Sequence, residues 1–429
     1  MLDLVDEKII IEGGHRLTGS VRVNGAKNAA LPVLAACILT KGTSCIKAIP
    51  QLTDVIIMEQ ILEELGLKVQ HLDDGSVEVG TVNIDKVTAP YELVNEMRGS
   101  ICVLGPLLAR RGTARVALPG GCVIGQRPID LHLKGLQAMG AEIVLQDGYI
   151  VAYATKLKGT EIYLGGTHGP TVLGTCNVMM AATLAEGTTI IECAAREPDV
   201  QDLAEFLVKA GAKINGVGTN RIVIQGVKEL RPVNHRIIPD RIEAGTLLIS
   251  GAITNGDVTV EDVTPDHLGA VTDKLREIGA SVSSEGNRCR VIGGRLEASV
   301  INTSAYPGIP TDLQPQFMSL LSIANGTSVI TEKVFPDRFM HIAELNRMGA
   351  NIQKEGPSAI VHGVPQLSGA KVVPSDLRAA ASLVVAGLAA QGTTEVRSIY
   401  HLDRGYERLE ERLAGLGAKV RRVADNRQP

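Results

Sequence analysis

Aromatic residues are scarce in this chain of 429 residues, which has no Trp, four Phe and seven Tyr. Proteins that bind single-stranded nucleic acid usually stack the bases on such rings, so the composition argues against that class of partner. Neither sign of charge dominates, because 43 Lys and Arg face 47 Asp and Glu. The whole molecule therefore has no strong field that would direct it to nucleic acid or to a membrane surface.

Several motifs that carry chemistry are also absent. The chain has no GK dipeptide, hence no Walker A loop, and it has neither an HExxH motif nor a G-x-G-x-x-G motif after a strand. Its seven Cys form an odd set without CxxC spacing, which predicts reduced thiols and neither a disulfide framework nor a zinc site. These absences argue against phosphoryl transfer through a magnesium-bound nucleotide, and no metal or cofactor is expected.

Apolar runs are short. The longest, such as AALPVLAACIL at residues 29–39, fall short of a membrane span. The beginning, MLDLVDEKIII, is acidic where a signal peptide would be basic. We therefore expect a cytoplasmic protein without membrane insertion.

What the chain does have is a repeat. Six times, at intervals of about 70 residues, an apolar stretch ends at a Gly, enters a short β-rich segment and then a second helical pattern that closes on another Gly. Solenoid repeats are shorter, so each unit should share a closed core with two neighbours, which predicts two lobes of three units. The first set of glycines is Gly42, Gly112, Gly187, Gly256, Gly326 and Gly392, and the second is Gly66, Gly140, Gly211, Gly279, Gly349 and Gly417.

The third unit shows the pattern most clearly. NVMMAATLA, residues 177–185, is apolar on every face and predicts a buried inner helix with Gly187 as its C′ residue. TTIIE predicts a strand, and residues 199–211 predict an amphipathic outer helix ended by Gly211. Residues 212–226 alternate around a turn and predict a hairpin. The expected fold is α/β, with six repeated βαβαββ-like units.

The two ends of the chain look like incomplete units. GAKVRRVADNRQP supplies one strand of the last hairpin, and KIIIEGG near the other end resembles a hairpin strand without a partner. We expect the N-terminal segment to cross back and complete the second lobe. This predicts a first lobe of residues 27–238 and a second lobe of residues 1–26 plus 239–429.

Polar residues gather just before each apolar helix, where the six units differ most. A buried helix presents free N–H groups and a positive dipole end at its N-terminus, so these positions predict a cleft that attracts anions. For any single Asp the alternative is an N-cap or a surface salt bridge. The cations at these positions are Lys27, Arg98, Arg241 and Arg378, and the acids are Asp240, Asp312 and Asp376.

A second polar concentration is ALPGGCVIGQRPIDLH, residues 117–132. Its glycines predict a mobile loop, and Cys122 and Arg127 lie in it away from any apolar stripe. A lone Cys is more often a core residue. Beside an Arg, Cys122 could instead serve as nucleophile or proton donor, and the spacing does not decide which.

Seven stretches then allow a family to be identified. The chain carries, in this order, NGAKNAALP, LPGGCVIGQRPIDLH, AATLAEGTTIIECAAREP, PTDLQPQF, VFPDRFMHIAELNRMGA, SDLRAAASL and IYHLDRGYE. Over nearly its whole length it resembles the UDP-N-acetylglucosamine 1-carboxyvinyltransferases, the enolpyruvyl transferases of peptidoglycan synthesis. The resemblance implies two inside-out α/β barrels, three units per lobe.

The resemblance also implies the reaction. The enolpyruvyl group of phosphoenolpyruvate passes to the 3′-hydroxyl of UDP-N-acetylglucosamine and phosphate is released, as the first committed step of peptidoglycan precursor synthesis. Cys122 would protonate C3 of phosphoenolpyruvate and would be the target of fosfomycin. Asp312 would orient the hydroxyl and is the candidate base, with Asp376 as the alternative.

Further substrate contacts are implied at matching positions. They are Lys27, Arg127 and Arg404 for the phosphate or carboxylate of phosphoenolpyruvate; Arg98, Arg338 and Arg378 for the rest of a cationic cleft; Arg127, Pro128, Ile129, Asp130 and Leu131 for the UDP moiety; and Asn28 and Val334 near the sugar.

One region departs from the family pattern. Relatives usually have a Lys against the nucleobase in the segment that corresponds to residues 165–177, and this chain has none there. Backbone contacts from Thr171 and Val172 to the diphosphate are still implied.

Three other interpretations compete with this one. The 5-enolpyruvylshikimate-3-phosphate synthases share the architecture and phosphoenolpyruvate, but the Cys122 loop and IYHLDRGYE favour the UDP-sugar enzyme. A ring clamp on DNA would line its channel with basic helices, whereas the repeated helices here are apolar. A silent paralogue could bind UDP-N-acetylglucosamine as a sensor, and retention of Cys122, Asp312, Lys27 and Arg404 argues against it.

Overall fold

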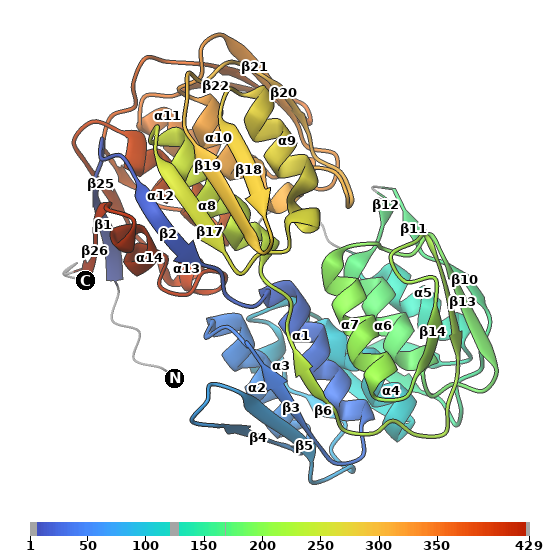
Figure 1. Cartoon of the computed structure of the whole chain (residues 1–429). Helices are drawn as coiled ribbons and strands as arrows, with labels where there is room; N and C mark the ends of the chain where they lie inside the picture. Colours follow the sequence, from blue (N-terminus) through green and yellow to red (C-terminus); the bar gives the residue numbers. More distant parts are fainter. Residues whose placement is uncertain (1–6, 121–127, 168, 426–429) are drawn as a thin grey trace. The chain divides into compact units, whose positions relative to one another are not determined.

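The chain forms two compact lobes (Figure 1). The computed structural model describes residues 7–120, 128–167 and 169–425. The N-terminal lobe comprises the described residues between Gly25 and Ile238, and the C-terminal lobe comprises those up to Asn24 and from Pro239 onward. Each lobe has a hydrophobic core of its own.

Each repeat builds one four-stranded sheet. The described residues form six such sheets and a two-stranded ribbon. In the third repeat the order is β10-β13-β15-β14, with β10 parallel to β13 and β15 antiparallel to both of its neighbours. The other five sheets repeat this order. The predicted α/β class and the predicted succession of strand, inner helix, strand, outer helix and hairpin are confirmed.

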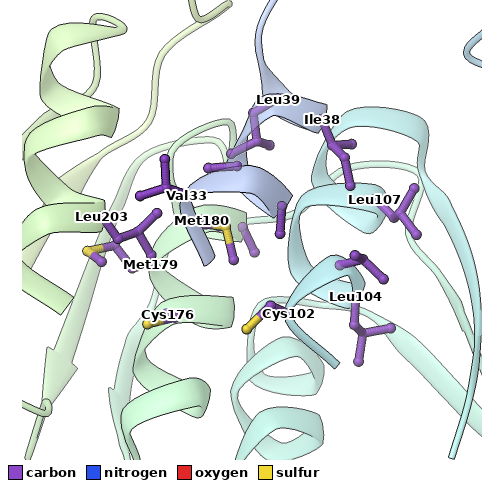
Figure 2. Close-up of a cluster of buried hydrophobic side chains, with 14 of the residues drawn as sticks. Val33, Ile38, Leu39, Cys102, Leu104, Leu107, Cys176, Met179, Met180 and Leu203 are labelled. Atoms are coloured by element: carbon purple, nitrogen blue, oxygen red, sulfur yellow. The ribbon is translucent and has the colours of Figure 1, made fainter. Parts of the chain in front are cut away.

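In the N-terminal lobe the inner helices α1, α4 and α6 meet in one apolar cluster. Figure 2 shows Val33, Leu104 and Met180 from these helices pointing into it. Burial on all sides makes helices of such apolar sequence stable. The elements of this lobe are α1 (Lys27–Ala36), η1 (Cys37–Leu39), β3 (Thr43–Lys47), α2 (Thr53–Glu64), β4 (Leu67–His71), β5 (Val77–Thr81), β6 (Thr88–Ala89), α3 (Tyr91–Val94), η2 (Arg98–Val103), α4 (Leu104–Arg111), β7 (Thr113–Ala117), α5 (Asp130–Ala138), β8 (Glu142–Gln146), β9 (Tyr149–Tyr153), β10 (Glu161–Tyr163), β11 (Gly165–Gly166), β12 (Gly169–Pro170), α6 (Val172–Ala182), β13 (Thr188–Glu192), α7 (Pro198–Lys209), β14 (Lys213–Asn215), β15 (Arg221–Gln225) and β16 (Asn234–Arg236).

In the C-terminal lobe the inner helices α8, α10 and α12 pack against one another inside the sheets (Figure 1). Although these helices are apolar, no helix in the described part of the chain has the length and apolarity needed to cross a bilayer. The elements of this lobe are β1 (Glu7–Glu12), β2 (Thr18–Arg22), α8 (Arg241–Ile253), β17 (Asp257–Glu261), η3 (Pro265–Leu268), α9 (Gly269–Glu277), β18 (Ser281–Glu285), β19 (Arg288–Ile292), β20 (Val300–Asn302), η4 (Thr311–Leu313), α10 (Gln314–Leu321), β21 (Thr327–Thr331), α11 (Ile342–Arg347), β22 (Asn351–Glu355), β23 (Ser358–His362), β24 (Lys371–Val372), α12 (Leu377–Ala389), β25 (Thr393–Val396), α13 (Tyr400–Asp403), α14 (Leu409–Gly415) and β26 (Lys419–Ala424).

Strands from distant parts of the chain complete three of the sheets. β1 is antiparallel to both β25 and β26, so that Ile9 faces Val396 on one side and Arg422 on the other. β2 runs parallel to β17 in the fourth repeat, and β16 runs parallel to β3 in the first. The N-terminal segment therefore belongs to the sheets of the C-terminal lobe.

The repeated glycines mark left-handed turns, with one error in the predicted role. α7 ends at Lys209 and Gly211, with φ of 108°, is its C′ residue as predicted. α6 ends at Ala182, so Gly187, with φ of 86°, precedes β13 after an intervening turn and does not cap the helix. The repeated glycines all lie in the described residues, and among them Gly256 alone lacks a positive φ.

Candidate functional site

In the C-terminal lobe the carboxylate of Asp312 is held between two buried arginines. Arg338 donates from Nη1 to Oδ1 of Asp312 at 2.7 Å, and Arg378 donates from Nη2 to Oδ2 at 2.9 Å. The side chains of Arg338 and Arg378 are 3% and 2% exposed, whereas that of Asp312 is 23% exposed. The carboxylate is thus the part of the cluster that solvent or a ligand can reach.

Three different elements bring these residues together. Asp312 lies in η4 just before α10, Arg378 in the first turn of α12, and Arg338 in the segment between β21 and α11. Burial alone would raise the pKa of Asp312, but the charges of Arg378 and Arg338 and their hydrogen bonds outweigh burial and hold it well below its usual range. Asp312 is therefore ionised at neutral pH and accepts hydrogen bonds strongly, but binds a proton weakly.

Asp376 and Asp240 are helix caps. Asp376 accepts from the backbone N–H groups of Arg378 at 2.9 Å and Ala379 at 3.1 Å at the start of α12. Asp240 does the same at the start of α8, with bonds to Ile242 and Glu243. The alternative of an N-cap is confirmed for both, whereas Asp312 caps no helix.

Two histidines lie near the Asp376 cap. The pKa of His341 is lowered to about 4, chiefly by burial and also by Arg338, against the opposing charge of Asp376. The pKa of His401 is lowered by its burial and by the charge of Arg404, with Asp376 again opposing. Arg404 and Asp376 are thus both close enough to His401 to influence it, and both histidines are expected to be neutral at pH 7.

A buried tyrosine, Tyr406, packs against Arg378. The hydroxyl of Tyr406 accepts from Nε2 of Gln316 at 2.9 Å and lies 2.9 Å from the hydroxyl of Thr246. The guanidinium carbon of Arg378 lies 5.3 Å from the centre of its ring. Through these contacts Tyr406 connects α8, α10 and α12.

In the N-terminal lobe the first cation is Lys27, at the beginning of α1. Its Nζ lies 2.6 Å from Oδ2 of Asp54, and the two side chains are 8% and 2% exposed. Asp54 therefore gives this buried side chain an ion-pair partner. Asn28 follows it and is half-buried.

Arg98 lies at the start of η2, next to a buried histidine. Burial and the charge of Arg98 lower the pKa of His132 to about 3. Nδ1 of His132 lies 2.9 Å from Nδ2 of Asn177, and Nδ2 of Asn177 also donates to the carbonyl of Ile101 at 2.8 Å. His132 is therefore neutral and accepts at Nδ1, an arrangement that fixes its ring between α5, α6 and η2.

The segments predicted to bind the nucleotide lie at the starts of α5 and α6. Pro128 and Asp130 are exposed, while Ile129 and Leu131 are half-buried. Thr171 caps α6, because its hydroxyl accepts from the N–H of Gly174 at 3.2 Å, and Val172 is the first residue of that helix. These positions place backbone N–H groups at helix N-termini, where phosphate oxygens bind well.

Two predicted residues, Cys122 and Arg127, lie outside the described residues. The remaining site residues fall into two groups that each lobe assembles separately. The N-terminal lobe contributes Lys27, Asn28, Arg98, Pro128, Ile129, Asp130, Leu131, Thr171 and Val172, and the C-terminal lobe contributes Asp312, Val334, Arg338, Asp376, Arg378 and Arg404. Across residues 7–120, 128–167 and 169–425, no cluster of His, Cys, Asp and Glu is large enough to hold a metal ion.

Sequence reasoning missed several residues that support this site. Asp54 lies in the first turn of an outer helix, and nothing in its local pattern connects it with Lys27. Glu332 follows strand β21, and its local sequence likewise gives no sign of the residues that it contacts. Tyr406 lies inside IYHLDRGYE, a stretch that carried the family resemblance, so that motif was the one available signal.

The chain is similar over nearly its whole length to known enolpyruvyl transferases. A family model described as EPSP synthase (3-phosphoshikimate 1-carboxyvinyltransferase) matches residues 11–413. The UDP-N-acetylglucosamine 1-carboxyvinyltransferase 2 of Carboxydothermus hydrogenoformans is 55% identical over 422 residues, which cover 98% of this chain and 100% of that protein. The UDP-N-acetylglucosamine 1-carboxyvinyltransferase of Methylacidiphilum infernorum is 53% identical over 418 residues, covering 97% and 99%.

Solved structures share the fold. The enolpyruvyl transferase NikO from Streptomyces tendae superimposes with a TM-score of 0.87 at 26% identity, covering 97% of this chain and 99% of that one. An EPSP synthase from Acinetobacter baumannii superimposes with a TM-score of 0.74 at 20% identity, covering 97% and 100%. The predicted two-lobed, inside-out α/β architecture is confirmed by these likenesses.

Proposed function

The chain belongs to the EPSP synthase family of enolpyruvyl transferases, and from this premise we propose that it transfers the enolpyruvyl group of phosphoenolpyruvate to the 3′-hydroxyl of UDP-N-acetylglucosamine. The observation that carries the choice of acceptor is 52–55% identity to four curated proteins of that name over at least 97% of the chain. The reaction would be the first committed step of peptidoglycan precursor synthesis. The enzyme would act in the cytoplasm and serve cell-wall biogenesis, cell shape and cell division.

The proposed chemistry is addition followed by elimination. The sugar oxygen bonds to C2 of phosphoenolpyruvate while C3 gains a proton, and the hydroxyl proton passes to a base. The C2–O bond to phosphate then breaks and C3 returns a proton, so the enol ether and inorganic phosphate are the products. Cys122 is proposed as the acid that protonates C3.

The C-terminal lobe would receive the acceptor hydroxyl. Its partly exposed Asp312 carboxylate is an ionised hydrogen-bond acceptor, which suits it to orient a hydroxyl. Its low pKa weakens it as a base while both arginines hold it. If Asp312 is the base, Arg338 or Arg378 must loosen its hold as substrate binds. Asp376 remains the alternative, although two backbone N–H groups donate to its Oδ1.

The cations would bind the two anionic substrates. Lys27 and Arg404, together with Arg127, are proposed for the phosphate or carboxylate of phosphoenolpyruvate, and Arg98, Arg338 and Arg378 for the rest of the cationic cleft. Asp54 supports this role for Lys27, because its carboxylate lies 2.6 Å from Nζ and holds the lysine side chain at the start of α1. The UDP moiety is assigned to residues 128–131 with Thr171 and Val172, and the sugar to Asn28 and Val334.

The second candidate is EPSP synthase activity, since the matching family model has that description. The solved EPSP synthase is only 20% identical, against 55% for the UDP-sugar enzyme, and this difference favours the UDP-sugar acceptor.

Phosphate release from phosphoenolpyruvate separates the candidates. We expect release that requires UDP-N-acetylglucosamine and that collapses in Cys122→Ala. Release with shikimate 3-phosphate alone would identify the EPSP synthase activity. If no phosphate is released with either acceptor, but the protein binds UDP-N-acetylglucosamine, a sensor would be favoured.

A further inference from the structure

In the fifth repeat, the backbone just after the central strand, β21, has a different conformation from that in most other repeats. In four repeats a residue other than Gly takes a left-handed conformation just after that strand, with φ of 50–58°: Ala48, Cys193, Asp262 and Ser398. After β21 the chain instead continues with Glu332, and none of the residues from there to Arg338 has a positive φ. Another interaction must therefore determine the conformation of this segment, which leads to Val334 and Arg338.

The carboxylate of Glu332 provides this interaction. It is fully buried, and its Oε1 accepts from the backbone N–H groups of Val334 at 2.9 Å and Phe335 at 3.0 Å. The same oxygen accepts from the hydroxyl of Thr303 at 2.6 Å. One side chain therefore anchors the turn to β20 and β21 through three hydrogen bonds.

Its second oxygen connects the turn to the Asp312 cluster. Oε2 of Glu332 accepts from the hydroxyl of Thr311 at 2.9 Å, and the Thr311 oxygen in turn accepts from Nη1 of Arg338 at 3.0 Å. That Nη1 also donates to Asp312. Because a hydroxyl has one proton and arginine only donates, the carboxylate receives the Thr311 proton and a lone pair of Thr311 faces Arg338. The direction of every bond in this relay is fixed.

We propose that Glu332 is a positioning residue that acts through Thr311 to hold Arg338, Asp312 and the backbone at Val334 in the geometry that receives the acceptor sugar. The proposal rests on the proposed function, in which Asp312 and Val334 meet UDP-N-acetylglucosamine. Glu332 itself is buried and would touch neither substrate. Its removal should therefore affect the acceptor and turnover more than the KM for phosphoenolpyruvate.

A double-mutant cycle tests the relay. We expect Glu332→Gln and Thr311→Val each to lower kcat/KM for UDP-N-acetylglucosamine by roughly 10- to 100-fold, since each leaves a buried partner unsatisfied. The double variant should be no worse than the worse single variant, because both break one relay. The proposal would be overturned if the loss of kcat/KM in the double variant equalled the product of the two single losses. It would also be overturned if KM for phosphoenolpyruvate rose as much as KM for UDP-N-acetylglucosamine. Thr311→Val is isosteric and tests the relay even if Glu332→Gln folds poorly.

The matched control is Ser328→Ala. Ser328 is buried on β21, the strand that Glu332 follows, and its hydroxyl accepts from the N–H of Ser299 at 3.2 Å, away from the relay. This variant should lose a comparable hydrogen bond and keep its kinetic constants. A loss of kcat/KM equal to that of Glu332→Gln would assign the effect to stability and overturn the proposal.

Hydrogen exchange measures the same claim without any activity. In the full chain, a peptide containing residues 333–338 should exchange at least about tenfold faster in Glu332→Gln than in wild type or Ser328→Ala, because the neutral amide oxygen of Gln accepts from the two backbone N–H groups more weakly than a carboxylate does. Unchanged exchange would overturn the positioning role. Faster exchange in Glu332→Gln, together with a wild-type protein that releases no phosphate with UDP-N-acetylglucosamine, would instead refute the proposed function and leave the anchoring by Glu332 supported.

Discussion

Arg378 donates to Oδ2 of Asp312 at 2.9 Å, and this ion pair joins the first turn of α12 to the start of α10. The arginine is almost fully buried, so its charge depends on Asp312 and on the ring of Tyr406 for compensation. The pair thus contributes to stability and presents an oriented carboxylate to solvent. A change at either residue should affect both properties.

Asp312→Asn should destabilise the protein by about 3 kcal/mol at pH 7, because it leaves two buried arginines without their counter-ion. The folded-state pKa of Asp312 lies well below the unfolded value, so the contribution is present at neutral pH and is lost as the pH falls below about 4. The difference in unfolding free energy between wild type and Asp312→Asn, measured by urea unfolding at several pH values, should be constant between pH 7 and 5. It should narrow below pH 4. Asp337→Asn, at a side chain that is 77% exposed, is the control, and a difference independent of pH would contradict this account.

Tyr406→Phe should cost about 1–2 kcal/mol of stability, because Gln316 and Thr246 lose a buried hydroxyl partner while the ring beside Arg378 remains. Tyr406→Leu also removes that ring and should cost at least about 1 kcal/mol more. Tyr153→Phe, at an exposed hydroxyl, should change stability little. Equal unfolding free energies for Tyr406→Phe and Tyr153→Phe would show that the buried hydroxyl is unimportant.

Glu243 should make stability fall as the pH rises. Its burial at the start of α8 raises its pKa to about 7, although Arg412 opposes the rise. Since the folded-state pKa exceeds the unfolded value of 4.5, the folded state binds the proton more tightly, and this stabilisation is lost between about pH 4.5 and 7. Relative to Glu243→Gln, wild type should lose up to about 3 kcal/mol across that window. The exposed Glu411→Gln is the control, and parallel pH profiles for wild type and Glu243→Gln would refute the shift.

Fosfomycin should alkylate Cys122, since a thiol that protonates phosphoenolpyruvate must approach its reacting carbon. Intact-mass spectra of the folded protein with UDP-N-acetylglucosamine should show one adduct, which disappears in Cys122→Ala. Cys193→Ala, at a thiol that is half-buried, should retain it. An adduct that persists in Cys122→Ala would assign the reactive thiol elsewhere.

The repeat made most of the fold predictable from sequence. Periodic apolar helices and paired glycines identified the six units, because each unit satisfies the same packing requirement. The local error at Gly187 arose because TLAE continues the apolar pattern beyond Ala182 although the chain there forms a turn. Apolar pattern alone does not fix where a fully buried helix ends.

The site was harder to predict, as its three Asp residues show. Asp240, Asp312 and Asp376 each lie one or two residues after a Pro at the start of an inner helix. Two are caps, while Asp312 receives Arg338 from a segment 26 residues away. Local sequence is nearly the same in the three cases, and the tertiary partner decides the role. The buried supports Asp54 and Glu332 escaped prediction for the same reason.

The most direct test of the central claim is a nuclear magnetic resonance measurement of the product formed from phosphoenolpyruvate labelled with ¹³C at C2 and C3 and from UDP-N-acetylglucosamine. The account predicts an enol ether carbon coupled to the 3′ position of the sugar, with one phosphate released per ether formed and none of either in Cys122→Ala. Labelled pyruvate without an ether, or an ether formed only with shikimate 3-phosphate, would contradict it.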